Sequence, residues 1–256
     1  MGEYTVKLNG FKMKDVDEYV VSTDYKLKNC KEEIWIICNE EAGNKKETHP
    51  SILREAIRLA IPEHIVSPYC TDEIKKVIWK TAVLFSYYTD KQFMPGTVIE
   101  IDKKKLDLIQ NWFSRLSKRT QEKETIKTQW NFALQEYLDT CDTSSLEQNY
   151  IHLITSLEAL LVYGNKGVIG KTVKNTVTLC AKDEEEQKRI KRIVKRAYDI
   201  RNSAVHGDLD KLVKKLERSN AFAEYFEFRK VVADVLYRSY GKEKKDLVME
   251  ILKQKV

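Results

Sequence analysis

The feature that most constrains the fold is a series of helical patterns from residue 103 to residue 256, without a convincing strand. Apolar residues recur there every three to four positions, as in amphipathic helices. Turn-forming residues divide the series into predicted helices at 103–118, 124–140, 145–163, 167–181, 184–206, 209–218, 220–240 and 243–254. We therefore predict a helical bundle for the larger part of the chain.

The residues before this series show a different pattern, made of short β-branched and aromatic runs. They predict strands near 4–8, 19–21, 33–37 and 98–101, and helices at 50–62 and 71–88. The expected fold class is α+β: a small mixed α/β domain of unknown role at 1–120, followed by an all-α bundle at 121–256. The boundary is placed in the polar stretch 117–127.

Composition restricts the class of protein. Charged residues make up 33% of the 256 residues, and nine Gly with four Pro are few, which fits long helices with charged outer faces. No apolar run approaches the roughly 20 residues that cross a bilayer, and the N-terminal residues do not resemble a signal peptide. We therefore expect a cytoplasmic protein without a membrane partner. The net charge of +6 is a mild bias towards polyanions.

Neither the cysteines nor the histidines are spaced like metal ligands. His49, His64 and His152 are isolated in the sequence, so we expect no metal site and no cofactor. Residues 165–172 nearly match a phosphate-binding loop, but the first position is Asn165 and a predicted helix precedes it where a strand is required. The cysteines are scattered and are expected to be reduced core residues: Cys30, Cys38, Cys70, Cys141 and Cys180.

The predicted helix at 184–206 concentrates residues that can do chemistry. At about 100° per residue, Arg201 falls within the apolar stripe, where a guanidinium needs an anion or a polar pocket. Asn202 and His206 share the opposite, basic face, and Gly207 predicts that the helix ends directly after His206. The basic face carries Lys188, Arg189, Arg192, Lys195 and Arg196.

Each of these residues also has a plain structural interpretation. A basic strip on a helix can be a solvated surface, a terminal His can cap its helix, and Arg201 can pair with a core carboxylate. The coincidence of Arg201, Asn202 and His206 within six residues favours a functional site.

The segment 201–207, Arg-Asn-Ser-Ala-Val-His-Gly, resembles the signature of HEPN domains, in which an Arg is usually followed by a polar residue and a His comes four to six positions after the Arg. Residues 130–134 with Tyr137 resemble the opening helix of the ApeA-like branch, and residues 157–161 resemble its second helix. Residues 196–202 lead into the motif. The resemblance covers roughly residues 124–256, about half of the chain, and does not extend to the first 120 residues.

The resemblance implies a HEPN-type helical bundle that dimerises and brings two copies of the motif together. It also implies metal-independent RNA cleavage by a toxin or an antiviral defence effector, with RNA, a second copy and a cognate antitoxin or regulator as partners. Residues five apart on a helix point about 140° away from each other, so Arg201 and His206 of one chain converge poorly. Two chains around a two-fold axis supply a fuller set of groups.

The roles follow from attack of the RNA 2′-hydroxyl on the neighbouring phosphate, which requires proton transfer and stabilised negative charge. We assign proton transfer to His206, phosphate binding to Arg201, and orientation of the histidine or the substrate to Asn202. Glu158 is a supporting candidate, either paired with Arg201 or an ordinary surface carboxylate. The predicted RNA-binding residues are Lys188, Arg192 and Lys195.

Two alternatives remain open at this point. The helical domain can be a non-catalytic HEPN module that binds RNA or dimerises, or the first domain can carry the main activity while the second dimerises it. The intact set of Arg201, Asn202 and His206 favours the endoribonuclease, because a pure scaffold has no need for it.

Overall fold

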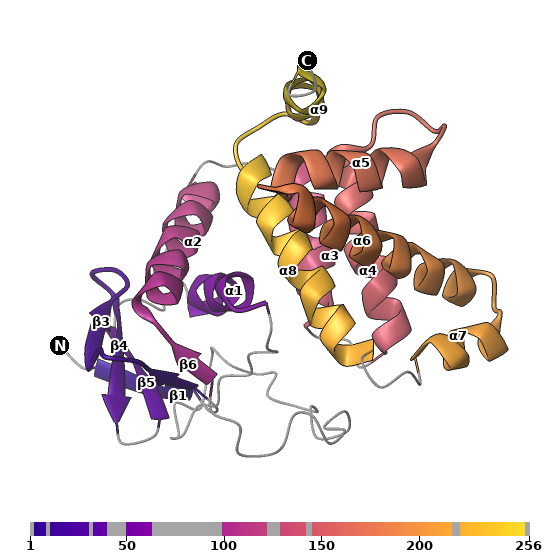
Figure 1. The fold of residues 1–256 in the computed structure, drawn as a ribbon. Helices are drawn as coiled ribbons and strands as arrows, with labels where there is room; N and C mark the ends of the chain where they lie inside the picture. The colour runs from indigo at the N-terminus through magenta and orange to yellow at the C-terminus, as the bar shows by residue number, and fades with distance from the viewer. Residues whose placement is uncertain are drawn as a thin grey trace. The chain divides into compact units, whose positions relative to one another are not determined.

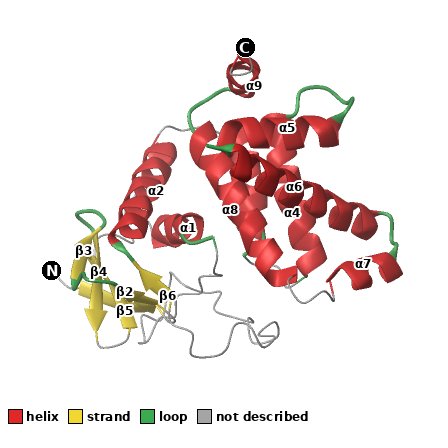
Figure 2. Ribbon diagram, in the orientation of Figure 1, coloured by secondary structure: helices red, strands yellow, loops and turns green. Residues whose placement is uncertain are grey.

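The computed structural model describes residues 3–8, 11–30, 33–39, 50–62, 99–121, 129–141, 145–216 and 221–253. The chain divides into two compact units, Met1–Glu124 and Thr125–Val256 (Figure 1). The described strands all belong to the first unit, and the described elements of the second unit are helices (Figure 2). The predicted α+β fold class is therefore confirmed.

The first unit contains a four-stranded antiparallel sheet in the order β1-β5-β4-β3. A separate parallel pair joins β2 to β6. In β5, buried Ile34, Ile36 and Cys38 alternate with the half-buried Trp35 and Ile37, so one face of the strand packs on the core. The strands are β1 (Glu3–Leu8), β2 (Phe11–Met13), β3 (Glu18–Val20), β4 (Tyr25–Cys30), β5 (Glu33–Asn39) and β6 (Ile99–Ile101).

Two helices complete the described part of the first unit. Helix α1 (Pro50–Ala60) begins at the proline that was predicted to open it, and it packs against α2 (Lys103–Gln121). Leu53 and Ile57 of α1 and Trp112 of α2 are buried. The predicted helix at 71–88 lies outside the described residues, as do His49, His64 and Cys70.

The second unit is a helical bundle in which α4 packs against α3, α5, α6, α8 and α9. Its core includes Tyr150 of α4, whose ring stacks on that of Phe228 at a centroid distance of 5.9 Å. The helices are α3 (Gln129–Asp139), α4 (Leu146–Leu161), α5 (Val168–Cys180), α6 (Glu184–Val205), α7 (Leu209–Leu216), α8 (Ala221–Ser239) and α9 (Lys244–Lys253). Each corresponds to a predicted helix.

The structure also bears on membrane spans and on the state of the cysteines. None of the helices in the described ranges combines the length and the apolar character needed to cross a membrane. Cys30, Cys38, Cys141 and Cys180 are free thiols; the last three are buried, as predicted for core residues, whereas Cys30 is only half-buried.

Candidate functional site

Helix α6 is defined by strong signals at both ends. Asp183 caps its first turn by accepting a hydrogen bond from the Glu186 amide at 2.8 Å. At the other end His206 is the C-cap, and Gly207 follows with a φ of 68°. The amides of Gly207 and Asp208 donate to the carbonyls of Ala204 and Ser203 at 3.2 and 3.0 Å, which is the Schellman pattern. The backbone that carries His206 is therefore held by the turn that ends the helix.

Arg201 is half-buried on the apolar side of α6, close to buried Ala197 and Ile200. Its Nη1 donates to Oδ1 of Asn202 at 3.2 Å. Its Nε is buried without a hydrogen-bond partner, and no carboxylate in the described part of the chain forms an ion pair with it. An incompletely paired guanidinium in a half-buried position favours the approach of an anion.

Glu158 is hydrogen-bonded to a residue other than Arg201. It is half-buried, and no ion pair joins it to Arg201 among the described residues. The Tyr198 hydroxyl instead donates to Glu158 Oε1 at 2.9 Å, and it is also hydrogen-bonded to Thr172 Oγ1 at 2.8 Å. These bonds connect α4, α5 and α6 through one buried phenol.

The pKa of the Tyr198 hydroxyl is influenced by both charged groups of the candidate site, Glu158 and Arg201. Burial raises the pKa of the Tyr198 hydroxyl, and the charge of Glu158 raises it further, while the charge of Arg201 acts in the opposite direction. The phenol therefore stays protonated and remains a hydrogen-bond donor. Glu158 and Arg201 both act on Tyr198 without pairing with each other, so Tyr198 is a member of the site that the sequence analysis did not include.

The His206 side chain stands apart from these groups. It is exposed, and its ring forms no hydrogen bond or ion pair with any residue that the structure describes. Only its backbone amide is engaged, with the carbonyls of Asn202 and Ala204. The structure thus brings Arg201 and Asn202 together and leaves the imidazole free at the end of the helix.

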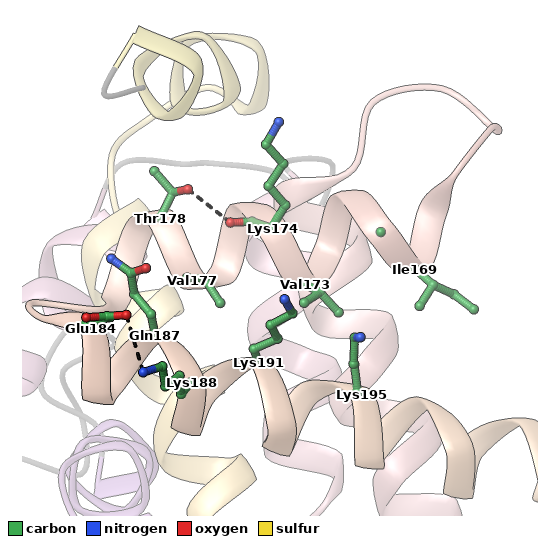
Figure 3. A pocket seen from close by; sticks show the side chains of 11 residues that line it. Ile169, Val173, Lys174, Val177, Thr178, Glu184, Gln187, Lys188, Lys191 and Lys195 are labelled. Carbon is green, nitrogen blue, oxygen red and sulfur yellow. Dashed lines mark hydrogen bonds and ion pairs between the residues drawn. The ribbon is translucent and has the colours of Figure 1, made fainter. Parts of the chain in front are cut away.

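The first half of α6 borders a hollow of about 460 Å³ between α5 and α6 (Figure 3). Lys188 and Lys195, two of the three predicted RNA-binding residues, line it, whereas Arg192 is exposed and is not among its lining residues. Lys191 and Lys195 project from α6 towards α5 (Figure 3). Lys174 of α5 adds a further lysine to the lining. Lys174 and Lys191 could be recognised only once α5 was known to face this side of α6.

The interior of this hollow is apolar. Ile169, Val173 and Val177 contribute its α5 side. No aromatic side chain of the described residues lines it, so these residues offer no surface on which a base could stack. A polyanion would therefore contact it through phosphates and the lysine ammonium groups.

The basic strip does not run unbroken to the motif. Asp199 is exposed on the same face, between Lys195 and Asn202. Lys215 of α7 donates to the Asp199 carbonyl and to Ser203 Oγ, both at 2.8 Å. Arg196 donates to the Lys215 carbonyl at 2.9 Å, and it lies 3.4 Å from Glu224 of α8. Arg196 is therefore a structural residue that holds α7 and α8 to α6.

The segment that resembles a phosphate-binding loop does not have that structure. Helix α4 precedes it, and α5 begins at Val168 after Gly167, so the segment joins two helices. The Lys171 ammonium donates to the Tyr163 carbonyl at 2.9 Å, and Thr172 is buried beside Tyr198. The segment lacks the strand that this phosphate site requires.

Comparison with models of protein families, with curated proteins and with solved structures gave no match for this chain. The resemblance to HEPN domains therefore rests on the motif and on the helices that surround it.

Proposed function

We propose that the chain is a metal-independent endoribonuclease of the HEPN type, with a composite site that two copies form together. The observation that carries this proposal is Arg201, a half-buried guanidinium without a carboxylate partner among the described residues. It lies beside Asn202 and in the last turns of a helix that ends at an exposed histidine, His206. These are the groups that phosphate binding and proton transfer require.

In the proposed reaction the 2′-oxygen of the RNA forms a bond to the neighbouring phosphorus, and the bond from phosphorus to the 5′-oxygen breaks. His206 accepts the proton of the 2′-hydroxyl, and a second imidazole protonates the departing 5′-oxygen. Arg201 stabilises the extra negative charge on the phosphate, and Asn202 holds the guanidinium through its hydrogen bond. The products are a 2′,3′-cyclic phosphate and a 5′-hydroxyl.

A second copy supplies the second imidazole. Arg201 is half-buried while His206 is exposed, and five helical positions separate them, so one chain directs them to different sides. A two-fold axis beside the end of α6 would place two motifs around one phosphate. Light scattering at tens of micromolar should report a homodimer; a monomer would contradict the composite site.

The test is incubation of the pure protein with mixed RNA in excess EDTA. We expect fragments with cyclic phosphate ends, and no cleavage by His206→Ala. The matched control is Val205→Ala, which changes the neighbouring side chain, 52% exposed, and should cleave like the parent. Loss of cleavage in both variants, or in neither, would contradict the role of His206.

The same assay distinguishes the proposed nuclease from the alternative, a HEPN module that binds RNA without cutting it. The lysine-lined hollow on α6 supports this alternative, because it needs no catalytic group. RNA binding without cleavage by the parent would favour this alternative.

A role as a toxin or an antiviral effector would appear as growth arrest on expression of the parent and not of His206→Ala, and an antitoxin or regulator would relieve that arrest.

A further inference from the structure

A second group of chemically capable residues lies on α3 and α4. Glu136 and Asp139 are three positions apart on α3 and therefore share a face. His152 comes from α4, which packs against α3. The ligand atoms of the three side chains all lie within 4.8 Å of one another. His152 is isolated in the sequence, but in the structure it lies next to two carboxylates.

The burial of this group distinguishes it from an ordinary acidic surface. The side chains of His152 and Glu136 are only 22% and 18% exposed, and their Nδ1 and Oε2 atoms lie 2.9 Å apart. Asp139 is half-buried as well, and it forms no ion pair in the described part of the chain. The group therefore brings one imidazole and two carboxylates together in a partly buried position between two helices. These are ligand types that a transition-metal ion accepts.

We propose that Glu136, Asp139 and His152 bind one divalent transition-metal ion, with Zn²⁺ as the ion that best suits the donors. One imidazole and two carboxylates match the nitrogen and oxygen ligands of zinc, whereas calcium and magnesium prefer a set of oxygen ligands. Water completes the coordination. This inference is independent of the proposed ribonuclease activity.

The geometry allows such a site with small movements. Bonds of about 2.0–2.2 Å place the ligand atoms of a tetrahedral zinc site about 3.3–3.6 Å apart. The 2.9 Å contact of His152 with Glu136 has to open slightly, and the longer separations, up to 4.8 Å, have to close. Rotation about the ends of two carboxylate side chains can supply these changes.

Asp139 already has support from a neighbouring side chain. Gln135 Nε2 donates to Asp139 Oδ1 at 2.7 Å, which limits the orientations of the carboxylate and leaves Oδ2 for a metal ion. A bound ion would connect the end of α3 to the middle of α4. Metal sites in helical bundles are commonly built in this way, from side chains on facing helices with an i, i+3 pair.

The experiment is a calorimetric titration of the full chain with ZnCl₂, after EDTA has been used to strip the protein and has been dialysed away. We expect saturable binding of one ion per chain and a higher melting temperature with Zn²⁺. Co²⁺ in place of Zn²⁺ should give the visible absorption of a coordinated ion. Absence of saturable binding at micromolar Zn²⁺ would overturn the proposal.

Two variants and two controls locate the ion. Asp139→Asn keeps the size of the side chain and the contact of Glu136 with His152, so the fold should persist while affinity falls at least about tenfold. His152→Ala should show the same loss. The controls are Glu147→Gln, a half-buried carboxylate of α4 outside the group, and His206→Ala, an exposed histidine elsewhere. Parental affinity in Asp139→Asn and His152→Ala, or loss of binding in His206→Ala, would show that this site is wrong.

Discussion

The two halves of α6 carry similar charges in different surroundings. In the first half, Lys188 is exposed and lies 3.3 Å from Glu184, one helical turn away. In the second half, Arg201 is partly buried and has no such carboxylate among the described residues. A flexible, solvated cation can attract a polyanion but cannot position it. A restrained guanidinium can do both, which is why we assign chemistry to the second half and binding to the first.

The largest expected effect comes from removing the restrained charge. Arg201→Ala should lower RNA cleavage by about a hundredfold or more, since a fixed donor to the transition state is lost. The melting temperature should change little, because no carboxylate among the described residues forms an ion pair with Arg201. A single-turnover assay at saturating RNA measures the first effect, and thermal unfolding measures the second. Parental cleavage would place the chemistry elsewhere.

A smaller effect on stability is expected at the buried phenol beside Arg201. Tyr198→Phe removes the donor to Glu158 and the bond to Thr172, and should lower the free energy of unfolding by about 1–3 kcal/mol. Urea denaturation measures the change. Tyr163→Phe is the control, because Tyr163 is 63% exposed and should tolerate the loss of its hydroxyl. Equal stabilities of the two variants would mean that the Glu158–Tyr198 bond contributes nothing.

The first half of α6 should affect binding alone. Replacing Lys188, Lys191 and Lys195 by Gln should weaken RNA binding and make its salt dependence shallower, by about 0.7 units of slope for each lost phosphate contact with single-stranded RNA. Cleavage at saturating RNA should be retained. Arg192→Gln, outside the hollow, separates the hollow from the whole basic face. If the triple variant keeps the parental affinity and salt slope, these lysines are only solvated.

The smallest expected effect tests the turn that ends α6. Gly207 has a φ of 68° and no atom within 4 Å of a Cβ added to it, so Gly207→Ala meets backbone strain but no clash. The cost should be about 1–2 kcal/mol of folding stability. Gly170→Ala is the matched control, since Gly170 lies in α5 with equal space and without a positive φ. Alanine there should stabilise the helix by about 0.5–1 kcal/mol, so similar melting temperatures for the two variants would contradict a strained turn.

The helices were predictable because their apolar periodicity is local. The strand β4 was missed although buried Tyr25 and Leu27 alternate with exposed lysines, because two apolar residues are a weak signal. The strand β2 has three residues, and its partner β6 lies far along the chain. No local pattern could have predicted that pairing.

In the candidate site, too, some features follow from local sequence patterns and others depend on how the helices pack. The place of Arg201 on the apolar side of α6 follows from helical periodicity, and Gly207 marks the end of the helix. The bond of Glu158 to Tyr198 joins residues 40 positions apart and depends on how α4 packs on α6. The group of Glu136, Asp139 and His152 likewise depends on the packing of α3 on α4. Such contacts arise from tertiary structure and leave no trace in spacing.

Helix α7 gives the end of α6 a further property. Its eight residues pack mainly on α6, through buried Leu212 and through Lys215, whose ammonium holds the Asp199 carbonyl and the Ser203 hydroxyl. So small a contact costs less free energy to open than the whole bundle does, so α7 can detach while the rest stays folded. The amides of α7 should then exchange with solvent deuterium together, ahead of those of α4. Each opening would also remove Lys215 from the Asp199 carbonyl and the Ser203 hydroxyl, so the lifetime of the docked helix should affect the order of the last turns of α6.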